Sequence, residues 1–185
     1  MEINRSEQYL KVAQLQGAYI GCMWLASFLC MANTLAMPLL SILGMGIGIG
    51  SLMAIVVMTY QFRWRVCQGD LSLLRTWVII MQAIFYASIL MAFGVFIYMR
   101  FMDHGAFGAY YEQMLSEPQT KLMMDQILTG TGVSSEEFVA QFTSITPINL
   151  AINILESNVL LGLFISLPLA LLSRIKIGSK LEKKN

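Results

Sequence analysis

The sequence predicts an all-α polytopic membrane protein that crosses the bilayer four times. Hydrophobic residues make up 57% of the 185-residue chain and charged residues only 12%, about half the charged share of an ordinary globular domain. Residues 12–62 contain no Asp, Glu, Lys, Arg or His. One crossing needs about 20 apolar residues, so this stretch is long enough for two transmembrane helices.

The first predicted helix spans about residues 12–36. A cleaved signal peptide is the alternative, but its apolar region would be only about 7–15 residues long and would follow a basic segment, not the mixed charges found here. Asn33, Thr34 and Pro38 predict a tight turn, since proline does not continue a helix. The second helix is expected over about residues 39–62.

The third helix is predicted over about residues 73–99 and the fourth over about residues 147–173. Pro147 suits the first position of a helix, and Thr146 precedes it as a capping residue. We expect the four helices to form one integral membrane domain that includes the whole chain, residues 1–185.

Residues 100–146 are the only sizeable extramembrane segment, which we expect to form short amphipathic helices on the outer membrane surface. Pro118 is expected to begin one helix, which ends near Thr129. Ser134 and Glu137, three residues apart, have the pattern of a capping box. One apolar face of each helix would lie among the lipid headgroups. The side chains on these faces are Phe107, Tyr110, Tyr111, Met114, Phe138, Phe142 and Ile145.

The placement of Lys and Arg predicts that both termini lie in the cytoplasm. Ten of the twelve basic residues fall in the N-terminal tail, the loop between the second and third helices, and the tail at residues 174–185. Cytoplasmic segments carry such an excess, whereas the opposite side holds only Arg100 and Lys121. The chain is therefore expected in a bacterial inner (cytoplasmic) membrane.

Small residues recur every four positions in three of the helices, which predicts close helix packing. Such faces let helices approach in lipid, where no hydrophobic effect drives them together. We favour packing within the chain, and docking of a partner subunit is the alternative. In the second helix, Gly46 and Gly50 lie on nearly the opposite face from Gly44 and Gly48. This helix is therefore expected to lie between two neighbouring helices. The predicted packing faces contain Gly17 and Gly21, Gly44 and Gly48, and Gly162 and Ser166.

Apart from Arg75 at the start of the third helix, Glu156 is the only charged residue inside a predicted span. Asn149 and Asn153 precede it at spacings that place all three residues on one helical face. Ionisable residues within membranes are candidate functional sites, and Arg100, at the outer end of the third helix, is the partner that we expect. A structural Glu–Arg pair, or a Glu bonded to the neighbouring Asn, is favoured over a transport site, because no second intramembrane acid or base accompanies Glu156.

No catalytic residues, cofactor or metal site are predicted. The sequence contains no Ser-His-Asp set, Walker motif or pair of facing carboxylates. His104 has no partner at a metal-ligand spacing, and Cys22, Cys30 and Cys67 are expected to be unpaired thiols. The net charge of +1 does not indicate a nucleic-acid partner.

The basic residues on the inner side are expected to set the topology and to touch anionic lipid headgroups. Arg63 and Arg65, on either side of Trp64, belong to this group together with the basic tail. A site for a polyprenyl-phosphate headgroup is the alternative, which no specific motif supports. Tyr60, Trp64 and Trp77 are expected to form an aromatic belt at the inner surface of the membrane.

Three stretches carry a resemblance to a known family. They are residues 67–72 (Cys-Gln-Gly-Asp-Leu-Ser), residues 97–103 at the outer end of the third helix, and residues 153–162 in the fourth. Through them the chain resembles the family catalogued as domain of unknown function 4199 (DUF4199), typical of the Bacteroidota. The resemblance implies a small four-span protein without an assigned activity. It also implies a neighbouring gene for a polyprenyl-phosphate sugar transferase of glycosyltransferase family 2.

Two functions from different classes agree with these observations. The favoured one is a non-enzymatic accessory or scaffold subunit in cell-envelope processes, whose partners are membrane lipid and a membrane glycosyltransferase, another envelope protein or a second copy of the chain. The alternative is a small oligomeric transporter of a solute or lipid that uses Glu156. An enzyme ranks last, since the sequence assembles no catalytic site.

Overall fold

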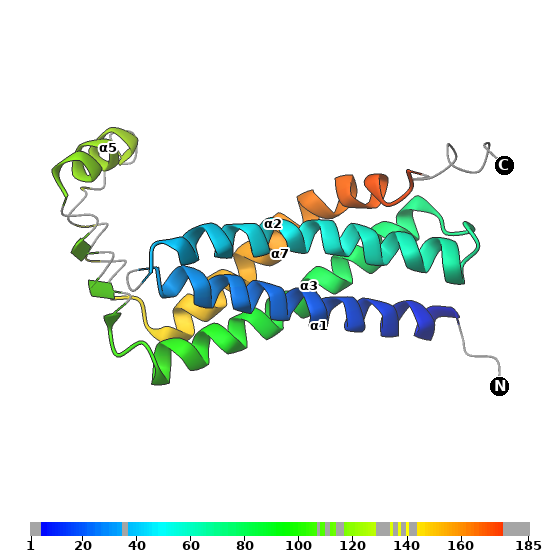
Figure 1. Cartoon of the computed structure of the whole chain (residues 1–185), viewed down its shortest axis with the longest axis horizontal. Helices are drawn as coiled ribbons and strands as arrows, with labels where there is room; N and C mark the ends of the chain where they lie inside the picture. Colours follow the sequence, from blue (N-terminus) through cyan, green and yellow to red (C-terminus); the bar gives the residue numbers. More distant parts are fainter. Residues whose placement is uncertain are drawn as a thin grey trace.

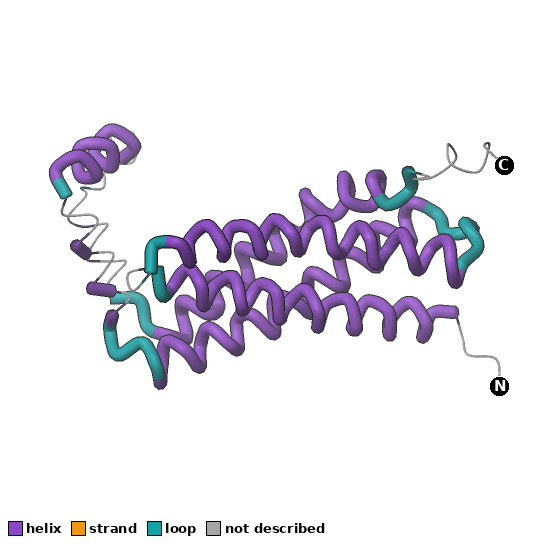
Figure 2. The backbone as a smooth tube through the Cα atoms, in the orientation of Figure 1, coloured by secondary structure: helices purple, strands orange, loops and turns teal. Residues whose placement is uncertain are grey.

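The computed structural model describes residues 5–34, 37–106, 108–109, 112–113, 117–128, 134, 137, 140 and 144–175. In these residues all regular secondary structure is helical (Figure 2). Four of the helices are long and apolar enough to cross a membrane. The predicted all-α class with four candidate spans is therefore confirmed.

The four long helices lie close to their predicted positions. They are α1 (Arg5–Ala32), α2 (Leu39–Gln61), α3 (Leu73–Phe101) and α7 (Pro147–Leu172). The main difference is that α1 begins earlier than expected, because the Gln, Glu, Leu and Lys residues before the apolar stretch also favour helix.

Local hydrogen bonds end and begin these helices where the sequence predicts. After α1, Asn33 Nδ2 donates to the Leu29 carbonyl oxygen at 2.8 Å, and Pro38 precedes α2. At the start of α7, the Thr146 hydroxyl accepts a hydrogen bond from the Asn149 backbone N–H at 3.4 Å. The predicted turn and the predicted Thr146 cap are both confirmed.

The four long helices form an elongated bundle in which α3 is central. α1 and α7 pack on α3, while α2 packs mainly on α1 (Figure 1). The start of α1 and the end of α7 lie at the same end of the bundle as the connection from α2 to α3 (Figure 1). The helices therefore alternate in direction, as a four-span topology requires.

The interior of the bundle is small and is filled by aliphatic residues, while the outer surface is also apolar. Ile20, Ile55 and Ile80 are almost completely buried in the main core. On the outside, Leu39 is 70% exposed and Phe164 is 78% exposed. Such a surface is suited to contact with lipid, because water would not solvate it favourably.

The helices α1 and α3 approach each other closely at Gly17. A Cβ atom added there would lie 2.6 Å from Tyr86 Cβ and 2.7 Å from the Ala83 carbonyl oxygen. At Gly21, an added Cβ would lie 3.0 Å from Leu90 Cβ. Glycine is therefore required at Gly17 for the two backbones to come together.

One glycine face of α2 also packs on α1, but its other face is open. A Cβ added at Gly44 would lie 2.9 Å from Met31 Cγ, whereas one added at Gly46 would meet nothing within 4 Å. At the depth of Gly46, the prediction that α2 lies between two neighbours is wrong. The reason is that α7 and α3 contact α2 far less than α1 does.

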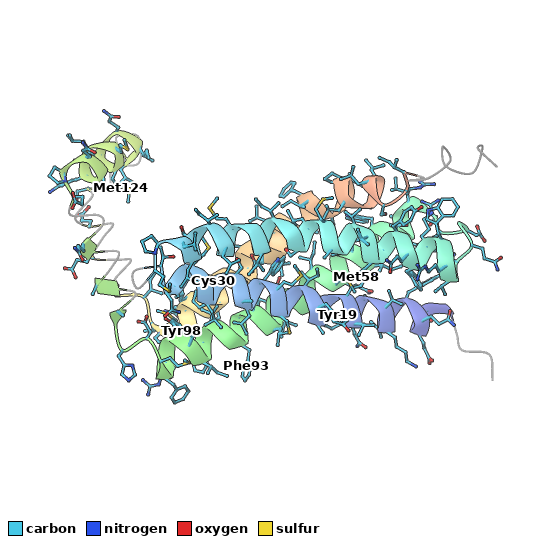
Figure 3. All side chains as sticks on the ribbon, in the orientation of Figure 1. Tyr19, Cys30, Met58, Phe93, Tyr98 and Met124 are labelled. Carbon is cyan, nitrogen blue, oxygen red and sulfur yellow. The ribbon has the colours of Figure 1, made fainter. Side chains whose placement is uncertain are left out.

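The segment between α3 and α7 contains α5 (Pro118–Leu128), which lies beyond the end of the bundle (Figure 1). It begins at the predicted Pro118, and its side chains Leu122, Met123 and Ile127 are 65–74% exposed. Met124, labelled in Figure 3, also belongs to α5. The predicted headgroup contact of this segment stays a prediction.

The capping box in the same segment is confirmed. Glu137 N donates to the Ser134 hydroxyl at 3.2 Å, and Ser134 N donates to Glu137 Oε2 at 3.2 Å. Of the apolar side chains predicted to face the lipid headgroups, only Ile145 is described. The others lie outside the described residues, and they are Phe107, Tyr110, Tyr111, Met114, Phe138 and Phe142.

Gly17→Ala is expected to lower the free energy of unfolding by about 1–3 kcal/mol, because the new methyl group overlaps the α3 backbone. Thermal unfolding of the purified protein in detergent measures this effect. Gly46→Ala is the matched control, since the added methyl group has open space around it. An equal loss of unfolding free energy in the two variants would contradict the α1–α3 contact described above.

Candidate functional site

The helix α7 has an inward face that is fixed by contacts with α3. Trp77 Nε1 donates to the Ser166 hydroxyl at 2.8 Å, and Asn158 Nδ2 donates to Met91 Sδ at 3.3 Å. Between these two bonds, a Cβ added at Gly162 would lie 2.5 Å from Ile84 Cγ2. These contacts leave α7 no freedom to rotate about its own axis.

The residues singled out in the sequence lie on the other side of α7. Asn149, Asn153 and Glu156 are all exposed, whereas Ala151 and Gly162 on the inward face are buried. At 100° per residue, the three polar side chains centre roughly opposite the buried ones. The structure therefore brings the three polar residues together on one outward-facing stripe, which we call the polar face of α7.

The polar face has no intramolecular partner among the residues that the structure describes. Across the described residues, the side chains of Asn149, Asn153 and Glu156 make no hydrogen bond or ion pair. Nearby exposed side chains on the same side, Ile152 and Leu160, are apolar. Glu156 is thus a carboxyl group that has the exposed Asn153 and Ser157 near it on an otherwise apolar surface.

The expected pair between Glu156 and Arg100 does not form among the described residues. Arg100 is exposed at the end of α3. The bond between Asn158 and Met91 sets the register of the two antiparallel helices, and this register places Arg100 about 10 Å farther along the bundle axis than Glu156. In addition, Glu156 does not point toward α3.

The polar face extends from the start of α7 to the middle of the span. Glu156 is nine residues beyond Pro147, which corresponds to about 14 Å along the helix and to nearly half of a bilayer core of about 30 Å. An acidic residue at this depth lowers the stability of membrane insertion by about 2.5–3.5 kcal/mol. The apolar length of α7 offsets that, yet the carboxyl group still lacks a polar contact.

Polar contacts between α1 and α2 were missed by the sequence reasoning. Ser27 Oγ donates to the Gly44 carbonyl oxygen at 2.7 Å, and Trp24 Nε1 donates to Ser51 Oγ at 2.8 Å. A third contact joins Thr59 Oγ1 to Gln16 Oε1 at 3.4 Å. The available signal was the presence of Trp, Gln, Ser and Thr inside apolar spans, because such groups seek partners away from water.

Trp77 was predicted in an aromatic belt at the membrane surface; its depth in a membrane stays a prediction, but its indole has a partner inside the bundle. Its indole N–H is bonded to Ser166, and its ring packs against the main core. The hydroxyl of Ser166 is completely buried and offers the indole a partner inside the bundle, so Trp77 does not need headgroups or water. Ser166 therefore acts as both a small packing residue and a hydrogen-bond acceptor.

Three cavities occur near the end of the bundle where α1 begins. The largest has a volume of about 400 Å³ and is lined by Gln8, Tyr9, Cys67 and Asp70, among others. Two smaller ones, of about 300 and 280 Å³, lie beside the first half of α1. None of these three is lined by Glu156, and the described cysteines Cys22, Cys30 and Cys67 form no disulfide with one another.

Comparison with known families gives a clear result. A family model described as "Protein of unknown function (DUF4199)" matches residues 15–174. The chain belongs to this family. The DUF4199 match begins within α1, ends just beyond α7 and so includes all four candidate spans. No curated protein and no solved structure matches the chain.

Glu156→Leu is expected to leave the thermal stability of the purified chain unchanged or higher, because no described partner loses a contact and the new side chain suits lipid. Ser166→Leu is the control, and it is expected to destabilise by about 1–3 kcal/mol through overpacking against α3. Melting temperatures in detergent compare the two. A loss of about 3–5 kcal/mol in Glu156→Leu would instead reveal a buried ion pair.

Proposed function

We propose that this DUF4199 protein is a non-enzymatic accessory subunit that docks a transmembrane helix of a partner protein on the polar face of α7. The observation that supports this proposal is the outward position of Asn149, Asn153 and Glu156 within a membrane-spanning helix. Charged side chains in membrane helices almost always face a protein interior or a water-filled cavity. A second protein would provide that interior.

The chemistry of the polar face indicates what the partner helix carries. The two asparagine amides can donate and accept hydrogen bonds, and such bonds between membrane helices contribute about 0.6–2 kcal/mol each. A Lys or Arg at the depth of Glu156 would complement the carboxylate and lower the unfavourable free energy of both charges in lipid. The partner is therefore a helix with one basic residue near mid-membrane.

A second copy of the chain complements this face less well. Two copies in one membrane are related by a two-fold axis normal to the bilayer, so identical residues meet at the same depth. Asn153 would find a suitable partner in its own copy, but Glu156 would meet another carboxyl group. A membrane glycosyltransferase of the cell envelope, implied by the family resemblance, is the first partner that we would test.

The transporter alternative has less support. Glu156 lies on the outside of the bundle near the middle of the span, and the three cavities described above lie toward the end where α1 begins and are not lined by it. Transport through Glu156 would require several copies arranged around a common path that one chain does not contain.

Site-specific photo-crosslinking in native membranes tests the docking proposal. A photoreactive residue at Leu160, beside Glu156 on α7, is expected to crosslink to a membrane helix that contains Lys or Arg. Tyr19 on α1 (Figure 3) is the matched control position, because both side chains are 59% exposed. Glu156→Lys should abolish the crosslink, and an acidic residue in place of the partner's basic one should restore it.

The other outcomes of that experiment are equally informative. Crosslinks from Leu160 to the same chain would establish a homo-oligomer and overturn the hetero-partner. Crosslinks to lipid alone from both positions, with normal protein levels, would contradict a docking function for α7.

We also propose that the bundle end formed by the start of α1 and the end of α7 faces the cytoplasm, on the strength of its basic residues. A membrane-impermeant maleimide applied to intact spheroplasts is expected to label Ser134→Cys in a Cys67→Ser background. It should not label Cys67 in the parent until the membrane is opened. Labelling of Cys67 alone in intact spheroplasts would reverse the orientation.

A further inference from the structure

Arg63 is a buried arginine at the bundle end where α1 begins and α7 ends. It belongs to the π-helical turn η1 (Phe62–Val66), which continues α2. Arg63 is 7% exposed, whereas Arg65, two residues later, is exposed. Neighbouring arginines of the same turn therefore have opposite environments, one inside the fold and one outside.

The Arg63 guanidinium is held in place but only partly bonded. Nη2 donates to the Gly69 carbonyl oxygen at 3.2 Å, and Cζ lies 5.6 Å from the centre of the Trp64 ring. Nε and Nη1 are buried and have no hydrogen-bond partner among the described residues. Buried polar atoms in native proteins are nearly always bonded, so two free nitrogens on one cation point to a missing acceptor.

The surroundings increase the need for a negative group. No described carboxylate forms an ion pair with Arg63, and Asp70, the acid of the adjoining loop, is exposed. Arg174, an exposed residue just after α7, has the same sign of charge and acts electrostatically on Arg63. An anion beside the buried Arg63 cation would offset both its burial and this repulsion.

We propose that Arg63 and Arg174 form a binding site for a phosphate group, such as that of an anionic lipid headgroup or of a soluble phosphate ester. Guanidinium groups match phosphate oxygens in charge and geometry, and basic pockets between transmembrane helices bind anionic headgroups. Because Nε and Nη1 are covered in this structure, phosphate binding requires the Arg63 side chain or the groups over it to shift. This site is independent of the polar face of α7.

The position of the site favours the lipid as the source of the phosphate. η1 and the end of α7 lie at one end of the bundle (Figure 1), where a headgroup layer would meet helices of this length. The Trp64 ring beside the guanidinium is a side chain typical of that layer. A lipid phosphate would reach Arg174 at the surface and Arg63 beneath it.

Native mass spectrometry of the purified protein in detergent tests the site. Phosphatidylglycerol is expected to give a one-to-one adduct that phosphatidylcholine does not give. Arg63→Gln should weaken this adduct about tenfold or more, and Arg174→Gln should weaken it in the same direction. Arg65→Gln is the matched control, since it removes the same charge from an exposed position of the same turn, and a change of about twofold or less is expected.

A competition with inorganic phosphate distinguishes the two sources. Displacement of the lipid adduct by millimolar phosphate would establish a site for soluble phosphate, and persistence of the adduct would establish a headgroup site. Equal loss in Arg63→Gln, Arg174→Gln and Arg65→Gln would overturn the proposal in favour of diffuse surface charge. Absence of any adduct in the parent protein with both probes would also overturn it. If Arg63→Gln does not fold, the test is the strength of the lipid adduct in Arg174→Gln compared with that in Arg65→Gln.

Discussion

The bundle depends on how closely α1 can approach α3 at Gly17. Lipid tails are as apolar as leucine, so burial of aliphatic surface does little to hold membrane helices together. Dispersion contacts between backbones and a few internal hydrogen bonds must do so instead. At Gly17 the absence of a side chain lets α1 rest on Ala83 and Tyr86. α2 is joined to α1 through hydrogen bonds at Trp24 and Ser27, and α7 packs on α3.

The sequence contained enough information for the spans and their ends, but not for the rotation of each helix. Span lengths follow from apolar runs, and the Thr146 cap and the Ser134–Glu137 box are local patterns that need no tertiary contact. Rotation is different, since a membrane helix is apolar on all sides and its periodicity does not show which face is inside. For this reason Trp77 was assigned to the membrane surface, and Glu156 was assigned an internal partner that the structure does not provide.

Glu156 and Arg63 are two charges whose environments are the reverse of what their positions suggest. Glu156 lies in the middle of a span and yet faces outward, while Arg63 lies at the end of a helix and yet is buried. The outward direction of Glu156 could not be predicted without knowing how α7 packs on α3. Arg63 could not be distinguished from Arg65 by sequence, because only the π-helical turn determines which arginine points inward. Each lacks an internal counterion among the described residues, and each calls for a different class of partner.

The pairing of helices follows the order in which a ribosome would deliver them. α1 and α2 are consecutive and share three polar contacts, so this hairpin can form as soon as both helices have left the translocon. α3 then adds to the exposed glycine face of α1. α7 follows the long segment that contains α5 and packs on Ile84 and Trp77 of α3. Each new helix thus joins a surface completed by earlier synthesis, and no helix has to wait for a later one to be correctly placed.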